Sequence, residues 1–200
     1  MIGYRRRTVV VWVVSCCAML ALAGPQLVAQ QEFSSANKKR GKAVVEYRDK
    51  AAHVVAAYNY SQRNHGSRWI VIQAALSTSK ETTIQRQEIA LRTPQGREIP
   101  LATQTRIGED VMKVEQLLQN AKVQAHDVAS YFRQQDRLED MQLFRLPFGP
   151  VVHDEFIVDR DHIATGPLFF ESPTGAWERG TYALVIRHGE GTAEMPIELE

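Results

Sequence analysis

The sequence predicts a mainly β protein, an antiparallel β-sandwich that carries one amphipathic helical insertion at about residues 109–133. Short runs of apolar and β-branched residues recur between Gly- and Pro-containing turns, which is the pattern of a sandwich. One later stretch changes its apolar spacing to three or four residues, the spacing of a helix face. The chain then closes on two alternating runs joined by a Gly-bounded turn within residues 175–200, as expected for a final hairpin.

The N-terminus has the form of a secretory signal. Arg5, Arg6 and Arg7 precede an apolar run of about 16 residues that ends in small side chains. This run is shorter than the roughly 20 residues that a membrane-spanning helix needs, so we favour cleavage over a retained anchor. Cleavage after Ala23 or Ala29 is possible, and Ala29 is favoured because it leaves space between the apolar run and the cut. We therefore predict a signal peptide over residues 1–29 and a secreted or periplasmic protein of the bacterial envelope.

Both cysteines, Cys16 and Cys17, lie inside this signal, so the mature chain is predicted to contain none. That excludes disulfides, a thiolate nucleophile and Cys-ligated metals. An alternative is lipid attachment at Cys16, because Val13-Val14-Ser15 before it has the form of a lipoprotein cleavage site; the apolar residues after Cys16 argue against it. Loss of the signal leaves 21 basic against 23 acidic residues, and this balance does not favour a nucleic-acid partner.

The mature chain is predicted to hold one domain. Residues 30–42, QQEFSSANKKRGK, are polar and charged, and they predict a disordered leader. Residues 43–200 are then enough for a single sandwich that buries a sizeable core without disulfides.

The first strands follow from apolar runs and their turns. We expect a strand at 53–60 and a second over Trp69–Leu76, where apolar and β-branched residues are almost continuous, as in a strand that is buried on both faces or central in a sandwich. Thr93-Pro94-Gln95-Gly96 predicts the turn of a hairpin between Ile89–Leu91 and Glu98–Leu101. Pro100 places the returning strand at a sheet edge, because proline has no N–H to donate.

The insertion is predicted from its period. Glu109 and Asp110 suit a helix N-terminus, and a helix of about 24 residues, or a helix pair broken near Asn120, would follow them. The apolar positions follow each other by three or four residues: Val111, Val114, Leu118, Ala121, Ala125, Val128 and Phe132. One apolar stripe predicts that the insertion lies against a sheet.

Strands are expected to resume after the insertion. We predict them at Met141–Leu146, Glu155–Val158, Pro167–Glu171, Thr181–Arg187 and Thr192–Leu199, with turns at Pro147–Pro150 and Ser172–Gly175. The run Gly180-Thr181-Tyr182-Ala183-Leu184 resembles the tyrosine corner of immunoglobulin-like sandwiches, in which a tyrosine at the start of the penultimate strand bonds back to the preceding corner. This resemblance implies an immunoglobulin-like sandwich and names no activity.

Polar residues that could hold a metal ion are densest between His153 and His162. A strand with Phe156 and Val158 facing the core would aim His153, Glu155 and Asp159 to one side, and imidazoles and carboxylates are zinc and manganese ligands. Extended chain at roughly 3.3 Å per residue spreads these side chains along about 20 Å, too far for one ion without a sharp bend. A solvated strand end is the favoured interpretation.

Other catalytic patterns are absent from the sequence. No serine stands in a Gly-x-Ser-x-Gly elbow, and Ser77, Ser79 and Ser172 are expected in turns. The Gly189–Gly191 segment joins two strands and opens no helix, so it lacks a phosphate-binding dipole. The acidic pairs at 109–110 and 139–140 are expected on solvated helix surfaces.

Aromatic residues in turns are better candidates for binding. Trp177 and Phe148 follow or occupy turn sequences, where an exposed ring could anchor a partner or stack on a sugar; the alternative is that each ring fills the end of the sandwich. Trp69 is expected in the core.

These observations predict an exported, non-enzymatic, envelope-associated binding or assembly module with no cofactor. Its partner would be an envelope protein or a glycan, contacted through loops, a sheet edge or the insertion. Two alternatives stay open: a metal-assisted hydrolase that uses His153, Glu155, Asp159 or His162, and an accessory subunit whose sheet edge completes a partner's sheet.

Overall fold

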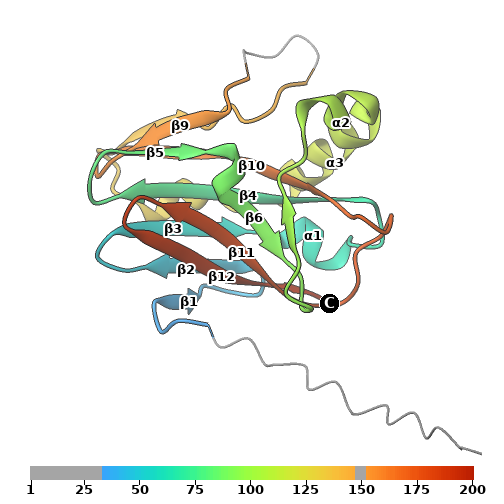
Figure 1. Ribbon diagram of the computed structural model, residues 1–200, viewed down its shortest axis with the longest axis horizontal. Coiled ribbons are helices and arrows are strands. Elements are labelled where there is room, and N and C mark those ends of the chain that lie inside the picture. The colour runs from blue at the N-terminus through green and yellow to red at the C-terminus, as the bar shows by residue number, and fades with distance from the viewer. Residues whose placement is uncertain (1–32, 147–151) are drawn as a thin grey trace, which may run out of the picture.

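The computed structural model describes residues 33–146 and 152–200, which form twelve strands in three sheets (Figure 1). The predicted signal peptide, its cleavage sites, Cys16 and the turn Pro147–Pro150 with Phe148 lie outside the described residues. The fold is mainly β and sandwich-like, as the sequence predicts.

The larger sheet has six strands in the order β1-β2-β3-β4-β10-β8. The strands are β1 (Asn37–Lys39), β2 (Val44–Arg48), β3 (Ala52–Ala57), β4 (Trp69–Thr78), β10 (His162–Glu171) and β8 (Arg137–Asp140). All neighbours are antiparallel except β8 and β10, which run parallel. A short helix, α1 (Asn59–Arg63), joins β3 to β4.

The second sheet has four antiparallel strands in the order β12-β11-β6-β7. These are β12 (Gly191–Leu199), β11 (Gly180–His188), β6 (Ile89–Arg92) and β7 (Glu98–Pro100). A two-stranded sheet pairs β5 (Thr82–Gln85) with β9 (Glu155–Val158), and the 3-10 turn η1 (Arg86–Glu88) links β5 to β6.

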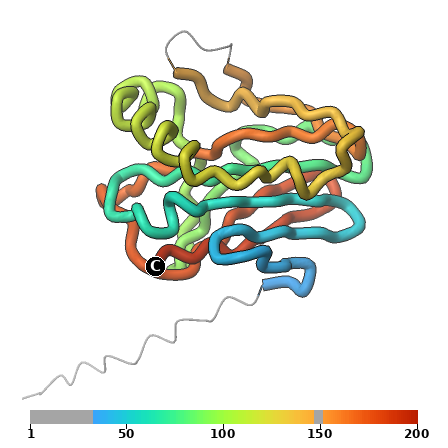
Figure 2. The backbone as a smooth tube through the Cα atoms, turned by 180° about the vertical axis from the view of Figure 1, so that it is seen from behind, coloured from blue at the N-terminus to red at the C-terminus, as the bar shows by residue number. Residues whose placement is uncertain are grey.

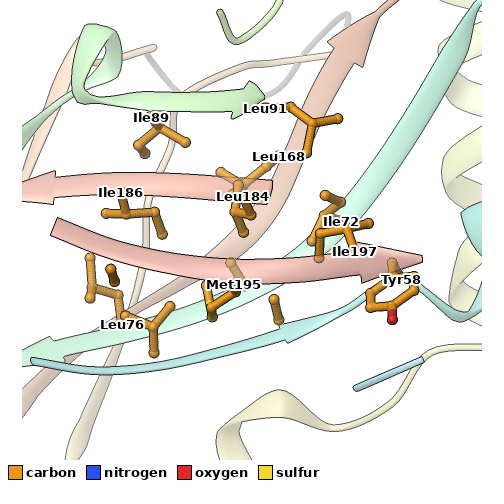
Figure 3. Close-up of a cluster of buried hydrophobic side chains, with 14 of the residues drawn as sticks. Tyr58, Ile72, Leu76, Ile89, Leu91, Leu168, Leu184, Ile186, Met195 and Ile197 are labelled. Atoms are coloured by element: carbon orange, nitrogen blue, oxygen red, sulfur yellow. The ribbon is translucent and has the colours of Figure 1, made fainter. Parts of the chain in front are cut away.

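The main core lies between the two larger sheets. Alternate side chains of β4, such as Ile72 and Leu76, meet Leu184 and Ile186 of β11 and Met195 of β12 in one cluster of buried side chains (Figure 3). Full burial of an aliphatic side chain is worth about 1.5–3 kcal/mol. These contacts therefore stabilise the packing of the two sheets on each other.

The insertion covers the other face of the six-stranded sheet. It consists of α2 (Gln104–Glu109), α3 (Val111–Val123) and the 3-10 turn η2 (Val128–Tyr131), which lie over the sheet in the view from behind (Figure 2). Val114 and Leu118 of α3 pack with Val71 of β4 and Phe169 of β10. The predicted strand over Trp69–Leu76 is therefore confirmed, and it is buried on both faces.

The hairpin predictions are also confirmed. β6 and β7 pair across the turn at Thr93–Gly96, where Gly96 has a φ of +84° and its N–H donates to the Thr93 carbonyl over 2.8 Å. β7 lies at the edge of its sheet, which suits Pro100. The predicted strand Glu155–Val158 and the closing β11–β12 hairpin are likewise present.

The predicted single helix at 109–133 is wrong in its bounds. The helical part begins earlier, at α2, where the Thr103 hydroxyl accepts a hydrogen bond from the Arg106 N–H. It ends at Val123, and the chain turns again at Asp127, whose carboxylate caps η2 by accepting from the Ala129 N–H. A side chain that bonds its own backbone in this way competes with the helix. The break predicted near Asn120 is also wrong, because α3 runs through that residue.

The predicted strand Met141–Leu146 is not formed. Its residues follow β8 and carry no strand pairing, and Gln142 has a left-handed φ of +48° that interrupts an extended chain. The alternation read from the sequence reflects burial alone, since Met141 and Leu143 are buried in the main core.

Two further expectations are corrected at the N-terminal end. The described part of the predicted disordered leader contains β1, whose Asn37 and Lys39 pair with Tyr47 and Val45 of β2. An edge strand needs backbone hydrogen bonds more than apolar side chains, so the polar composition of this segment hid it. The strand predicted at 53–60 ends at Ala57, because α1 begins at Asn59.

Candidate functional site

A cleft of about 660 Å³ opens where β7, α2 and the turn between β10 and β11 meet. In Figure 1 the light-green chain of β7 rises toward α2 beside this turn. Three features that are predicted from the sequence to serve in binding meet at this cleft: the edge strand, the insertion and the turn Ser172–Gly175. Its size falls within the roughly 300–1,000 Å³ that is usual for ligand sites.

The floor of the cleft is apolar because β7 buries its central residue and the two residues after the strand are also buried. Ile99, Leu101 and Ala102 are buried and face the protein, whereas Pro100 and Pro173 are exposed on the walls. The Ala102 N–H donates to the Phe169 carbonyl over 2.9 Å, which ties the end of the floor to β10. The floor is therefore fixed by the backbone of both large sheets.

Guanidinium groups line the walls. Arg106 binds Glu171 with two hydrogen bonds, from Nε to Oε2 at 3.0 Å and from Nη2 to Oε1 at 2.7 Å, and Nη1 of Arg68 lies 3.6 Å from the same Oε1. The hydrogen bonds from Arg106 hold the pKa of the Glu171 carboxyl below its ordinary value. Glu171 is thus a charged group that fixes both arginines in place.

The remaining charges of the cleft leave it electropositive. Glu98 also lines it, but both of its carboxylate oxygens lie 2.6 Å from Nη2 of Arg187, and Arg92 donates to it as well. Arg97 forms no salt bridge with any residue of the described chain. Arg68 also lies 3.9 Å from Asp110, and Arg106 also binds Glu109, so Arg97 is the guanidinium of the cleft that has no carboxylate partner among the described residues.

The free edge of β7 offers little for strand addition. Hydrogen-bonded and non-bonded pairs alternate in an antiparallel ladder, and the Thr93 N–H donates to Arg97 over 2.8 Å. Glu98 and Pro100 therefore turn their backbone outward, and proline has no N–H. Within β7 the outward edge holds one donor, the N–H of Glu98, so recognition at this cleft depends on side chains.

The residues predicted as possible metal ligands do not form a site. His153 and Glu155 are exposed, and Nδ1 of His162 lies 2.6 Å from Oδ2 of Asp159, which raises the pKa of the histidine. Asp159 also accepts from the backbone N–H groups of Asp161 and His162. Across residues 33–146 and 152–200, no three His, Cys, Asp or Glu side chains gather closely enough to hold a metal ion.

Trp177 belongs to the core and not to the surface. It is buried, its Nε1 donates to the Arg68 carbonyl over 3.1 Å, and its ring meets Tyr182 edge-on at 5.6 Å. The hypothesis of an exposed anchor is therefore wrong for Trp177, and the alternative, a ring that fills the sandwich end, is confirmed. Trp69 is also buried, and its Nε1 donates to Asp110.

The other polar candidates are also placed by the fold. Ser77 lies inside β4 and not in a turn, whereas Ser172 opens the turn between β10 and β11. Glu139 and Asp140 lie on β8 and not on a helix. Gly189–Gly191 forms the tight turn between β11 and β12, as expected.

Sequence patterns could not have found the arginine cleft. Arg68 precedes β4, Arg106 lies in α2 and Glu171 ends β10, so these residues meet only after β4 and β10 pair with Trp69 opposite Glu171. No local spacing carries that information.

None of the helices in the described part of the chain is long and apolar enough to cross a membrane. No protein-family model, curated protein or solved structure matches the chain.

Proposed function

We propose that the protein is an exported, non-enzymatic binding or assembly module of the bacterial envelope, and that it holds an acidic, extended segment of a partner protein in the arginine cleft. One observation carries this proposal: three arginines line the cleft above an apolar floor, and one of them, Arg97, has no carboxylate partner within the described residues. Arginine matches carboxylates through paired hydrogen bonds, which suits it to interface recognition.

The chemistry of the cleft supports a peptide with alternating acidic and apolar side chains. In an extended segment, successive side chains point to opposite sides. Apolar side chains would pack on the exposed Pro100 and Pro173, and a carboxylate would bridge Arg68 and Arg97. The single outward N–H of β7 argues against the alternative in which a partner strand simply extends this sheet.

Two further features fit an exported module. The Arg5–Arg7 signal supports export and the predicted loss of both cysteines. The bond between the Tyr182 hydroxyl and the Glu178 carbonyl supports an immunoglobulin-like classification of the sandwich, an architecture that many surface and envelope proteins use to present loops and edges.

A matched pair of peptides and of variants tests the proposal. The probes are the blocked pentapeptides acetyl-Glu-Val-Glu-Val-Glu-amide and acetyl-Lys-Val-Lys-Val-Lys-amide, titrated by amide chemical shift. We expect saturable binding of the acidic peptide alone, with shifts at residues 97–103 and 172–175. The double variant Arg68→Gln/Arg97→Gln should weaken it about tenfold or more, because each charged hydrogen bond is worth roughly 1.5–3 kcal/mol.

The control variant is Arg63→Gln, which removes an exposed arginine of α1 away from the cleft. It should leave the affinity unchanged. Equal affinity for the acidic and basic peptides, or equal weakening by the control, would overturn the proposal. Binding of a uronic-acid oligosaccharide in place of the peptide would favour the glycan as partner.

A further inference from the structure

A second cavity, separate from the arginine cleft, lies on the outer face of the six-stranded sheet. It has a volume of about 510 Å³, and its walls are the β2–β3 turn, the end of β4, the chain that follows η2 and the turn before β10. Figure 2 shows the insertion passing over this face of the sheet. We call it the His53 cavity, after the buried histidine in its floor.

Three polar side chains form a row across the floor. Arg48 is the register partner of His53 on neighbouring strands, and His53 is the register partner of Ser77 on the next. Directly opposed residues in antiparallel strands point to the same face, with Cβ atoms about 4.5–5.5 Å apart. A guanidinium, an imidazole and a hydroxyl thus stand side by side in the cavity.

Glu46 and Phe132 fix the orientation of the His53 imidazole. Its Nε2 lies 2.9 Å from Oε1 of Glu46, and Arg40 donates to the other carboxylate oxygen over 2.6 Å. Burial raises the pKa of the Glu46 carboxyl, but the hydrogen bonds from Arg40 and His53 outweigh it, so the pKa is lowered overall. The ring of Phe132 packs on the imidazole at 4.2 Å. The ionised Glu46 therefore accepts a hydrogen bond from Nε2–H of His53, which leaves a lone pair on Nδ1 of the neutral imidazole.

Two nearly buried polar groups in this row have no partner in the described chain. His53 is 8% exposed and Ser77 is 9% exposed, and both line the cavity. Neither Nδ1 of His53 nor the Ser77 hydroxyl makes a hydrogen bond within residues 33–146 and 152–200. Neither atom is shut off from solvent, so each reaches the open space of the cavity. The two groups are consequently available to a ligand.

The charge of the walls indicates what kind of ligand this is. Arg48, Lys50 and Arg160 line the cavity and form no salt bridge with the part of the chain that the structure describes. Arg133 is also present, held by Asp136 at 2.9 Å and Asp161 at 2.6 Å. The cavity therefore presents more positive than negative groups.

The acidic groups of the cavity are already occupied. Asp49 accepts hydrogen bonds from the Ala51 and Ala52 N–H groups and from the Tyr47 hydroxyl, at 2.7–2.8 Å. Asp136 accepts from the backbone N–H of Arg133 and is buried. Both carboxylates keep their charge, but four basic side chains line the cavity against these two: Arg48, Lys50, Arg133 and Arg160.

We propose that the His53 cavity is a binding site for a compact oxyanion, a phosphate, sulfate or carboxylate group, held by the Arg48 guanidinium and the Ser77 hydroxyl. On binding, His53 takes one proton from solvent, so that Nδ1–H donates to the anion while Nε2–H keeps its bond to Glu46. The charge gained by the imidazole lies between the bound anion and Glu46, and Arg48 and Arg40 flank it. This site is independent of the acidic-peptide cleft and survives if that proposal fails.

Sulfate is the best probe because its charge does not change between pH 6 and 8. We expect titration of the purified protein, at constant ionic strength, to give saturable amide shifts confined to the β2–β3 turn, Ser77–Ser79 and residues 131–133. The affinity for sulfate should rise at least about threefold from pH 8 to pH 6, because histidine becomes protonated as the pH drops through this interval. Burial raises the pKa of the Asp49 carboxyl, but the hydrogen bonds from Ala52, Tyr47 and Ala51 outweigh it and lower the pKa overall, so Asp49 keeps its charge across this interval.

Variants separate the site from surface charge in general. Arg48→Gln should weaken sulfate binding about tenfold, because a charge-assisted bond is lost, whereas Arg63→Gln on α1 should not change it. His53→Gln should keep measurable binding and lose its pH dependence, which also distinguishes His53 from His188, a buried histidine influenced by Asp49. Inorganic phosphate and acetate, titrated in parallel, identify whether the site prefers a phosphoryl or a carboxylate group.

Shifts that stay linear in sulfate, or that spread over surface lysines and arginines, would show a solvated cavity and overturn the proposal. The same conclusion would follow if Arg48→Gln and Arg63→Gln bound sulfate equally. Folding of each variant is checked by its thermal transition before titration.

Discussion

The Tyr182 hydroxyl donates a hydrogen bond to the carbonyl oxygen of Glu178, 3.0 Å away, across the bend that leads into β11. The same tyrosine meets Trp177 edge-on, and burial raises the pKa of its phenol. The corner thus joins the backbone before β11 to an aromatic pair at the end of the core, which fixes the point at which the strand starts.

Tyr182→Phe tests the contribution of this corner. The variant keeps the aromatic packing but leaves the Glu178 carbonyl without its donor, so we expect the free energy of unfolding to fall by about 1 kcal/mol. Tyr60→Phe is the matched control, because the Tyr60 hydroxyl makes no hydrogen bond within the described residues. Urea denaturation followed by tryptophan fluorescence measures both, and equal stability of the two variants would contradict the prediction.

Two glycine-to-alanine changes are expected to act in opposite directions. Gly96 has a φ of +84° in the β6–β7 turn and no neighbouring atom within 4 Å of an added Cβ, so Gly96→Ala should destabilise the protein by about 1–2 kcal/mol through backbone strain alone. Gly108 lies within α2, is equally unobstructed and has no left-handed φ, so Gly108→Ala should stabilise by about 0.5–1 kcal/mol. Thermal unfolding should order the proteins as Gly108→Ala, parent, Gly96→Ala; any other order is inconsistent with these backbone conformations.

The buried His188 should make the free energy of unfolding depend on pH. It ends β11 in the buried row that includes Leu184 and Ile186, and its Nε2 has no hydrogen-bond partner in the described chain. Burial lowers the pKa of its imidazole, although the carboxylates of Asp49, Glu190 and Glu88 oppose this. Below about pH 6.5 the unfolded chain therefore takes up a proton that the folded chain does not, and stability is lost as the pH falls toward the lowered folded value.

His188→Leu should remove this contribution and flatten the decline of unfolding free energy between pH 7.5 and pH 5.5. His53, whose pKa is also lowered by burial, should supply what decline remains. His153→Gln, at an exposed position, controls for the loss of one histidine. The measurement is a set of urea curves at several pH values, and an unchanged slope in His188→Leu would refute the assignment.

The elements that the sequence predicts well have strong local signals. The apolar run of β4, the Thr93–Gly96 turn and the β11–β12 hairpin each depend on neighbouring residues, and all three are present. The bond from Tyr182 back to Glu178 belongs here too, because it joins residues only four positions apart. Where a few adjacent side chains decide the conformation, pattern and structure agree.

The predicted helix is wrong in its bounds because some apolar residues fit the helical spacing although no helix buries them. Ala125 fits the helical stripe, yet it is exposed, because α3 ends at Val123. Phe132 fits the same stripe but packs on His53 from an irregular segment after η2. Periodicity reports which side chains are buried and does not report whether one helix buries them all.

Neither proposed site was visible in the sequence for a related reason. The arginine cleft depends on Arg68 and Glu171 being brought together by the pairing of β4 with β10. The His53 cavity depends on the cross-strand register of Arg48, His53 and Ser77. Register across a sheet is set by the whole fold, and single segments do not reveal it.

The position of β4 has a consequence for how the chain acquires its structure. One neighbour of β4, the strand β3, is synthesised just before it. The other neighbour, β10, is synthesised only after all the elements from β5 to β9, including the insertion. Closing so long a loop costs chain entropy before the new contacts repay it, so the molecule should fold slowly for its size. During synthesis, the apolar strand β4 therefore keeps one edge without a hydrogen-bonded partner until the final third of the polypeptide has been made. A chaperone that shields such edges should raise the yield of native protein.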